Sequence, residues 1–385
     1  MIERKEERMR EIGIYIHIPF CKSKCIYCDF NSFCNKDTYI KDYVKSLKTE
    51  IQNRSNSNFC VKTIFIGGGT PSYIDSQYID EILTTIDINY NVDDDVEISI
   101  EMNPGTVDEK KMEDYFDIGI NRISIGLQTS NNMLLKKIGR IHTYSEYEKT
   151  VEIAKRVGFR NINTDVMIGL PGQTIYHVED TINKLLEKNL QHISVYSLIV
   201  EPDTPMEKLV DSNKYILPDD EIERYMYWYA KRKLEENGFI HYEISNFARP
   251  EYRCKHNLDC WNQKEYLGFG VSAASYENGV RFVNTDSIDE YISNIENHIG
   301  YKNIHIEEKQ DVTSMMNEYM ILGLRKIAGV DIPSFKEKFK QDPLTIYFEK
   351  LMNLREKGLI ICTNDNIRLT KKGLDLANQV WEKFL

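Results

Sequence analysis

The chain has 385 residues, of which 41% are hydrophobic and 28% charged, a composition typical of folded globular proteins. Its formal net charge of -11 argues against nonspecific nucleic-acid binding, which depends on clustered Lys and Arg. No apolar run approaches the ~20 residues of a membrane span. The early run IYIHIPF is too short for a signal-peptide core, so we expect a cytoplasmic protein.

Strand-like and helix-like segments alternate through the first half of the chain. The predicted strands cover residues 12–18, 61–68, 96–102, 122–128, 162–170 and 192–198. Helices are predicted between them at residues 38–54, 76–87, 108–117, 145–157 and 176–189. This alternation predicts an α/β fold with a parallel sheet and right-handed crossovers. Six such units are enough for an incomplete (β/α)6 barrel.

The second half of the chain has a different organisation. Residues 221–239 read as a helix that ends near Gly238, and we expect the segment to about residue 300 to pack beside the open edge of the barrel as an extra β/α segment. From about residue 308, three helices, two short strands and a last helix predict a small winged-helix-like unit. Charges of both signs alternate there, which favours packing or partner docking over DNA binding. The predicted domains are 1–205, 206–305 and 306–385.

Three of the eight cysteines follow the first predicted strand directly. Cys21, Cys25 and Cys28 have the spacing Cys-x3-Cys-x2-Cys. Three thiolates this close can bind three irons of a 4Fe-4S cubane and leave the fourth iron without a protein ligand. A structural zinc with Cys34 as fourth ligand, or a redox pair, is the alternative, but the chain has no second CxxC hairpin. We therefore predict an iron-sulfur cluster.

Unusual polar or glycine residues also stand at the ends of the second, third and fourth predicted strands and within the fifth. They are Gly68, Gly69 and Thr70 in GGGTP, Glu101 in SIEMNP, Gln128 in SIGLQT and Asp165 in NTDVMIGLPGQT. In a barrel of parallel strands these carboxyl ends meet on one face, where ligands bind. Each residue alone could be a satisfied polar group. Convergence from four strands predicts a ligand site beside the cysteines.

The phrase YIHIPFCKSKCIYCDF resembles the signature of the radical S-adenosylmethionine (SAM) superfamily. It is most similar to the family that joins oxygen-independent coproporphyrinogen III dehydrogenases (HemN) with heme chaperones (HemW), over about residues 12–280 and more weakly in the tail. The resemblance implies that SAM chelates the open iron and is cleaved reductively to a 5'-deoxyadenosyl radical. It assigns no catalytic residue. The positions that match SAM contacts are Tyr15, Gly68, Gly69, Thr70, Glu101, Gln128, Arg140 and Asp165.

Two features are similar to the chaperone branch of that family. The dehydrogenases have a longer extension before the first strand and a C-G-C phrase, whereas this chain has Cys28-Asp29-Phe30. The stretch KHNLDCWNQ resembles an H-N-x-x-Y-W phrase proposed to serve heme binding, with Cys260 at the tyrosine position. Either His256 or Cys260 could then bind heme iron. The alternative for His256 is a buried histidine that is hydrogen-bonded within a turn.

The resemblance therefore implies a heme chaperone that binds heme, passes it to acceptor proteins and takes electrons from a donor. Such chaperones are associated with heme-induced homodimers. We expect SAM cleavage without coproporphyrinogen dehydrogenase activity. Two alternatives stay open: oxidative decarboxylation of coproporphyrinogen III, and methyl transfer to heme or heme degradation.

Overall fold

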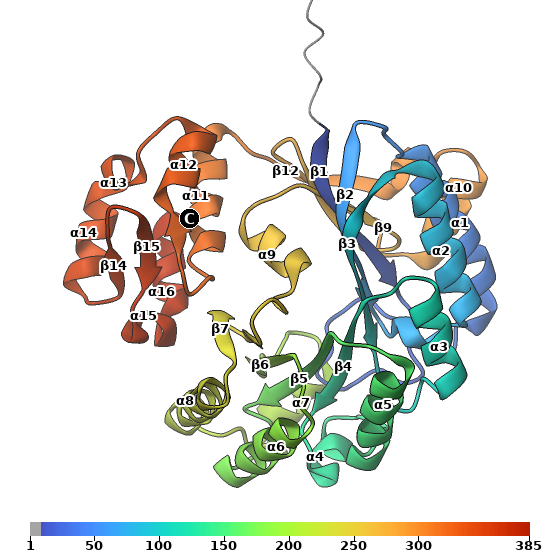
Figure 1. Cartoon of the computed structure of the whole chain (residues 1–385), viewed down its shortest axis with the longest axis horizontal. Coiled ribbons are helices and arrows are strands. Elements are labelled where there is room, and N and C mark those ends of the chain that lie inside the picture. The colour runs from blue at the N-terminus through green and yellow to red at the C-terminus, as the bar shows by residue number, and fades with distance from the viewer. Residues whose placement is uncertain (1–8) are drawn as a thin grey trace, which may run out of the picture.

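A computed structural model describes residues 9–385, so the charged start at residues 1–8 lies outside the described residues. Its main feature is one sheet of twelve strands in the order β12-β11-β10-β9-β1-β2-β3-β4-β5-β6-β8-β7. Figure 1 shows that the sheet is curved. The six predicted strands are all present. They are β1 (Arg10–Ile18), β2 (Phe59–Gly68), β3 (Asn91–Met102), β4 (Arg122–Gln128), β5 (Ile162–Ile168) and β6 (His192–Ser197).

These six strands are parallel and are linked by helices that pack on the outer side of the curve (Figure 1). The five predicted helices are α1 (Ile40–Asn53), α2 (Ser76–Asn89), α3 (Glu109–Asp117), α5 (Tyr144–Val157) and α6 (Ile175–Glu187). A further helix, α4 (Asn132–Lys137), was not predicted. It has only six residues, too few to give a helical periodicity, and it begins at the Asn131 cap.

The alternation of side chains along β4 explains how one strand serves both the core and the interior. Ile123, Ile125 and Leu127 are fully buried and share a hydrophobic cluster with helix residues such as Met112 and Tyr147. The residues between them are Arg122, Ser124, Gly126 and Gln128, which line the cavity described below. Since successive side chains point to opposite faces, the apolar set seals the sheet against the helices and the polar set faces inward.

The segment after β6 completes both ends of the sheet, whereas one open edge was expected from the sequence. β7 (Ile240–Glu243) and β8 (Asn246–Ala248) add antiparallel strands beside β6. β9 (Tyr266–Phe269) pairs parallel with β1, and β10 (Ala274–Glu277), β11 (Val280–Asn284) and β12 (Ile304–Lys309) extend that end. The sheet remains open, so the predicted incomplete barrel is confirmed. The helices of this segment are α7 (Pro205–Asp211), α8 (Asp220–Glu236), α9 (Lys255–Trp261) and α10 (Ile288–Glu296).

The C-terminal residues form a separate hydrophobic cluster around Met320, Phe335 and Val380. Their strands, β13 (Val330–Asp331), β14 (Ile360–Cys362) and β15 (Asn366–Leu369), make a small antiparallel sheet. Their helices are α11 (Val312–Gly323), α12 (Ile332–Phe339), α13 (Pro343–Ile346), α14 (Phe348–Glu356), α15 (Lys371–Asp375) and α16 (Ala377–Trp381). This order agrees with the predicted winged-helix-like unit. Figure 1 shows the unit in orange and red, with α9 in yellow between it and the strands.

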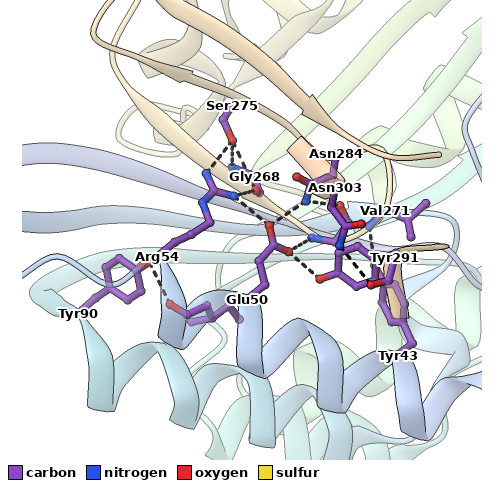
Figure 2. A network of polar contacts seen from close by, with 12 residues as sticks. Tyr43, Glu50, Arg54, Tyr90, Gly268, Val271, Ser275, Asn284, Tyr291 and Asn303 are labelled. Atoms are coloured by element: carbon purple, nitrogen blue, oxygen red, sulfur yellow. Dashed lines mark hydrogen bonds and ion pairs between the residues drawn. The ribbon is translucent and has the colours of Figure 1, made fainter. Parts of the chain in front are cut away.

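A buried carboxylate ties α1 to the late strands, as Figure 2 shows. Glu50 accepts hydrogen bonds from Arg54 at 3.0 Å, from the Gly270 nitrogen at 2.9 Å, from Asn284 at 2.8 Å and from the Tyr291 hydroxyl at 2.6 Å. Each lone-pair direction of the carboxylate is therefore used, as a buried charge requires. The network fixes β9 to β11 against the N-terminal half of the chain.

No helix among residues 9–385 combines the length and the apolar character that a bilayer crossing needs.

Candidate functional site

A cavity of about 490 Å³ opens at the carboxyl ends of the parallel strands. It brings together ten of the residues predicted from the sequence: Cys21, Cys25, Cys28, Gly68, Gly69, Thr70, Glu101, Gln128, Arg140 and Asp165. Tyr15 is not among the lining residues, and its hydroxyl lies 3.0 Å from Nδ1 of His17. The burial of Tyr15 raises its pKa, and the charge of Glu101 adds to this effect. Tyr15 therefore lies behind the cavity wall as a neutral phenol.

The cysteine loop is held between the two halves of the chain. At its base, the Cys21 nitrogen donates to the Phe33 carbonyl at 3.0 Å, and the Phe33 nitrogen donates to the Pro19 carbonyl at 2.6 Å. Near its end, Asn31 donates to Ser272 Oγ, 2.7 Å away. The loop therefore rests on the residues that follow β9 as well as on β1.

The three thiols face the same cavity but have different neighbours. Cys21 Sγ lies 3.4 Å from Oγ1 of Thr70, and Cys25 Sγ accepts a hydrogen bond from Arg140 at 3.7 Å. Burial raises the pKa of the Cys21 thiol, and it raises the pKa of Cys28 to about 11. Iron would displace these protons on binding, since the thiolate is the ligand.

The donor set suits a cluster with one open iron. Three soft sulfur donors line one wall, and polar side chains from four strands line the others. Within residues 9–385, no three His, Cys, Asp or Glu side chains are grouped around a position for one metal ion. A cubane does not need such a group, because each thiolate binds a different iron.

The glycines of GGGTP allow the end of β2 to approach β1. A Cβ at Gly68, where φ is +108°, would lie 2.6 Å from the His17 ring. A Cβ at Gly69 would lie 2.9 Å from the Ile18 carbonyl oxygen, which accepts the Gly69 N-H. The expected close backbone approach is therefore made to the protein's own first strand. It also brings Thr70 beside Cys21.

Glu101 and Asp165 bring two carboxyl groups into the same interior. Burial raises the pKa of Glu101 to about 7, and the charge of Asp165 contributes to this rise. Burial also raises the pKa of Asp165. The hydrogen bonds that it accepts from Asn163 at 2.8 Å and Ser124 at 3.1 Å act in the opposite direction and lower its pKa. Near neutral pH, Glu101 is therefore divided between its protonated and ionised forms. Such a carboxyl group can both donate to and accept from a hydroxyl group of a ligand.

Gln128 occupies an irregular end of β4. Its φ is +71°, and the register between β4 and β5 shifts between Gly126 and Gln128. The left-handed backbone of Gln128 at this bulge is strained, and the bulge changes the direction of its side chain. Strained residues of this kind are concentrated at functional sites. Tyr196 donates a hydrogen bond to Gln128 Oε1 at 3.2 Å. Tyr196 also lines the cavity, but sequence reasoning did not select it.

Asn103 is a second site residue that the sequence analysis missed. Its Nδ2 donates to Thr70 Oγ1 at 2.9 Å, and its Oδ1 accepts from Arg140 at 2.6 Å. It therefore joins the end of β2 to the arginine beside Cys25. Its place two residues after Glu101 in SIEMNP, where the third strand ends, was a usable signal.

The two predicted heme ligands lie outside the lining of this cavity. His256 is 7% exposed, its Nδ1 lies 2.8 Å from Thr63 Oγ1, and its ring stacks on Phe65. Burial lowers the pKa of His256 to about 4, with a further effect from the Arg122 charge. This is the buried, hydrogen-bonded histidine of the alternative reading, although its partner is on β2 rather than in its own turn. Burial raises the pKa of Cys260 to about 12.

The end of α9 contacts the C-terminal unit. The Arg325 guanidinium lies 4.4 Å from the Trp261 ring and 5.2 Å from the Trp381 ring. Next to Trp261, Asn262 accepts a hydrogen bond from Lys326. Trp261 of the HNxxxW stretch therefore packs between the sheet and the C-terminal unit, while Asn257 from the same helix lines the cavity.

The chain is similar to known proteins over most of its length. Residues 15–185 match the model of the radical SAM superfamily, and residues 311–376 match that of the HemN C-terminal domain. Heme chaperone HemW from Bacillus subtilis is 38% identical over 375 residues, which cover 96% of this chain and 98% of that protein. The chain belongs to the HemW family. HemW from Lactococcus lactis is also 38% identical, over 96% of each chain.

A solved structure gives the same fold as this HemW-family chain. Coproporphyrinogen III oxidase (HemN) from Escherichia coli, described as a radical SAM enzyme, is 21% identical and has a TM-score of 0.85. The likeness covers 99% of this chain and 91% of that one. Membership of the radical SAM superfamily implies a 4Fe-4S cluster and SAM, as predicted from the cysteine spacing and the signature.

Proposed function

We propose that this HemW-family chain is a radical SAM heme chaperone, which binds heme and transfers it to acceptor proteins. The observation that carries the proposal is the cavity that joins three thiols to polar side chains from β3, β4, β5 and β6. Its family relatives named as heme chaperones align with nearly the whole chain. Heme as cargo fits this family, and the cytoplasm is the compartment that we propose for it.

Cys21, Cys25 and Cys28 are the residues that would hold the cluster. When bound, the cluster supplies the electron that cleaves the SAM sulfonium, and a protein donor would supply that electron. The chain's own residues position and shield the ligands. Thr70 and Asn103 order the loop beside Cys21, and the carboxyl groups of Glu101 and Asp165 suit the hydroxyl and amino groups of SAM.

That His256 or Cys260 binds the heme iron remains a prediction. Ligation by His256 would require its ring to leave Thr63 and Phe65. Cys260 is partly exposed, but its raised pKa means that iron would have to displace the thiol proton. A homodimer is part of the same proposal.

Anaerobic heme titration of the cluster-loaded chain tests the function. We expect a shifted Soret band with the wild-type chain and transfer of heme to an apo-acceptor. His256→Ala and Cys260→Ala, each titrated in the same way, identify the ligand by loss of the shift. Absence of any Soret shift in the wild-type chain would refute the chaperone function.

The HemN fold supports one alternative, oxidative decarboxylation of coproporphyrinogen III. An anaerobic assay of the cluster-loaded chain with coproporphyrinogen III, SAM and a reductant separates the two functions. Formation of protoporphyrinogen would establish the dehydrogenase, and we expect none.

A further inference from the structure

The cavity continues inward from the cysteine loop along the inner face of β4. Arg122 is the first residue of the strand and Gln128 the last, and both line the cavity together with Ser124 and Gly126. At about 3.3 Å per residue, these two ends lie roughly 20 Å apart along the strand. The cavity therefore has an outer end at the cysteines and an inner end at Arg122.

Arg122 is a buried charge with few partners. Its side chain is 2% exposed, and its Nε makes no hydrogen bond to any described residue. Its one side-chain hydrogen bond within residues 9–385 is a long contact of 3.5 Å from Nη1 to Ser99 Oγ. A guanidinium has five donors and stays charged at all physiological pH values. Such a group is unfavourable in a protein interior unless an anion pairs with it.

The acidic side chains whose charges act on Arg122 already accept bonds from other donors. Glu97 accepts from the backbone nitrogens of Lys255 at 3.0 Å and His256 at 3.1 Å, and so caps the start of α9. Asp165 accepts from Asn163 and Ser124. Both carboxylates act on Arg122 through their charge, but neither forms an ion pair with it at 4.0 Å or less in the part of the chain that the structure describes. The negative charges nearby therefore favour the charged form of the guanidinium, but no carboxylate of the described residues forms an ion pair with it.

The walls at this level are polar, and they include the carboxyl groups of Glu101 and Asp165 beside neutral side chains. By register, Ser124 is opposite Asn163, and Ser194 is opposite both Asp165 and Asn246. These side chains line the cavity, as does Asn257 from α9. The neutral side chains offer hydrogen bonds around a ligand group. Burial raises the pKa of both carboxyl groups, which favours their uncharged forms.

We propose that Arg122 is the centre of a carboxylate-binding subsite at the inner end of the cavity. It takes one carboxylate of an extended ligand whose other end lies near the cysteine loop. The planar guanidinium fork forms two parallel hydrogen bonds with a carboxylate. The identity of the ligand rests on the proposed function: it is a tetrapyrrole, and the carboxylate is one of its propionates. The carboxylate of SAM is the other source of this chemistry, but a SAM bound at the cluster would place it at the opposite end.

The test compares two iron porphyrins in the cluster-loaded full chain. Iron protoporphyrin IX carries two propionates, and its dimethyl ester carries none. We expect the wild-type chain to bind the free acid about tenfold or more tightly than the ester. In Arg122→Met we expect the ratio of the two affinities to fall to about one, because only the free acid binds more weakly. Arg122→Lys should keep part of the preference for the free acid. SAM affinity stays unchanged in both variants. Arg156→Met, which alters an exposed arginine, keeps the full preference.

A stability measurement separates this role from a structural one. If Arg122 serves a ligand, Arg122→Met without ligand should unfold at the same temperature as the wild-type chain or higher, because an uncompensated buried charge has been removed. A large fall in the unfolding temperature of both Arg122→Met and Arg122→Lys would overturn the proposal in favour of a structural role. So would loss of SAM affinity, or an acid preference that survives in Arg122→Met.

Failure of the proposed function gives a different result. If the wild-type chain binds neither porphyrin, the chaperone function fails, and stabilisation by succinate then tests the subsite alone. A rise in unfolding temperature with succinate that is lost in Arg122→Met would support a carboxylate site for another ligand. No rise in the wild-type chain would overturn the subsite as well.

Discussion

The guanidinium of Arg140 contacts the thiol of Cys25, with Nη1 donating to Sγ over 3.7 Å. Its Nη2 donates to Asn103 Oδ1 at 2.6 Å and also to the Gly126 carbonyl. One buried side chain therefore connects the cysteine loop to the ends of β3 and β4. The position of the cysteine loop over the cavity depends on this arginine.

We expect Arg140→Met to weaken both the fold and cluster retention. The substitution leaves Asn103 Oδ1 and the Gly126 carbonyl without a donor, at about 1–3 kcal/mol for each buried group. The free energy of unfolding, measured in urea, should fall by about 2–5 kcal/mol, and iron per chain should fall with it. The control is Arg156→Met, where the lost surface pair with Glu109 is worth at most about 1 kcal/mol. Equal stability and iron content in the two variants would contradict the connecting role.

Cys25→Ala and Cys34→Ala form a matched pair around the cluster. Cys34 is a nearby cysteine that does not line the cavity. We expect Cys25→Ala to lose the visible cluster absorbance and SAM cleavage together, because two thiolates hold a cubane weakly. Cys34→Ala should keep both. A full-strength cluster in Cys25→Ala would show that the ligand assignment is wrong.

The protonation of Glu101 should make stability depend on pH. Its pKa is about 7 in the folded chain against an ordinary value of 4.5, so the folded state binds more protons than the unfolded state between these values. The free energy of unfolding therefore falls as the pH rises from 4.5 to about 7, by about 3 kcal/mol in total for this group. Glu101→Gln cannot ionise and should lack this fall. Urea midpoints of the ligand-free chains at pH 5 and pH 8 measure the difference, and parallel curves for both proteins would disprove it.

Glu50 and Glu81 allow a test of the network in Figure 2. The Glu50 carboxylate accepts four hydrogen bonds, and in Glu50→Gln an amide NH2 that cannot accept replaces one of its oxygens. We expect the free energy of unfolding to fall by about 3–5 kcal/mol. Glu81→Gln weakens the partly exposed pair with Lys48 and an exposed hydrogen bond from Gln77, and should lower the free energy of unfolding by at most about 1 kcal/mol. Urea unfolding compares the two. A cost for Glu50→Gln no larger than that for Glu81→Gln would mean that the network does not stabilise the fold.

The long parallel strands could be predicted from the sequence because their apolar runs are continuous. Predicted and observed bounds of β4 coincide at residues 122–128, and those of β1 differ by two residues at the start. The four-residue strand β9 gave no comparable signal, and its pairing with β1 joins residues about 250 positions apart. The segment after β6 was therefore expected at one edge, although it builds both.

The site was predictable where strand order alone determines position. Glu101 and Gln128 lie at the ends of β3 and β4, and Asp165 lies within the neighbouring strand β5. The parallel topology therefore brings the three side chains into one cavity. His256 was different, because its partner Thr63 is 193 residues away and no spacing rule reaches that far. Arg122 was passed over for another reason: an arginine that opens a strand reads as a surface charge until the burial of that strand is known.

The pairing of β1 with β9 orders the maturation of this protein in time. During synthesis, one edge of β1 has no neighbour until residue 269 has left the ribosome, and Asn31 of the cysteine loop has no Ser272 to bind until shortly afterwards. The nascent N-terminal half thus presents an open hydrogen-bonding edge and a loosely tethered trio of thiols. The full set of contacts around the cysteine loop therefore forms only after residues 266–272 have been made.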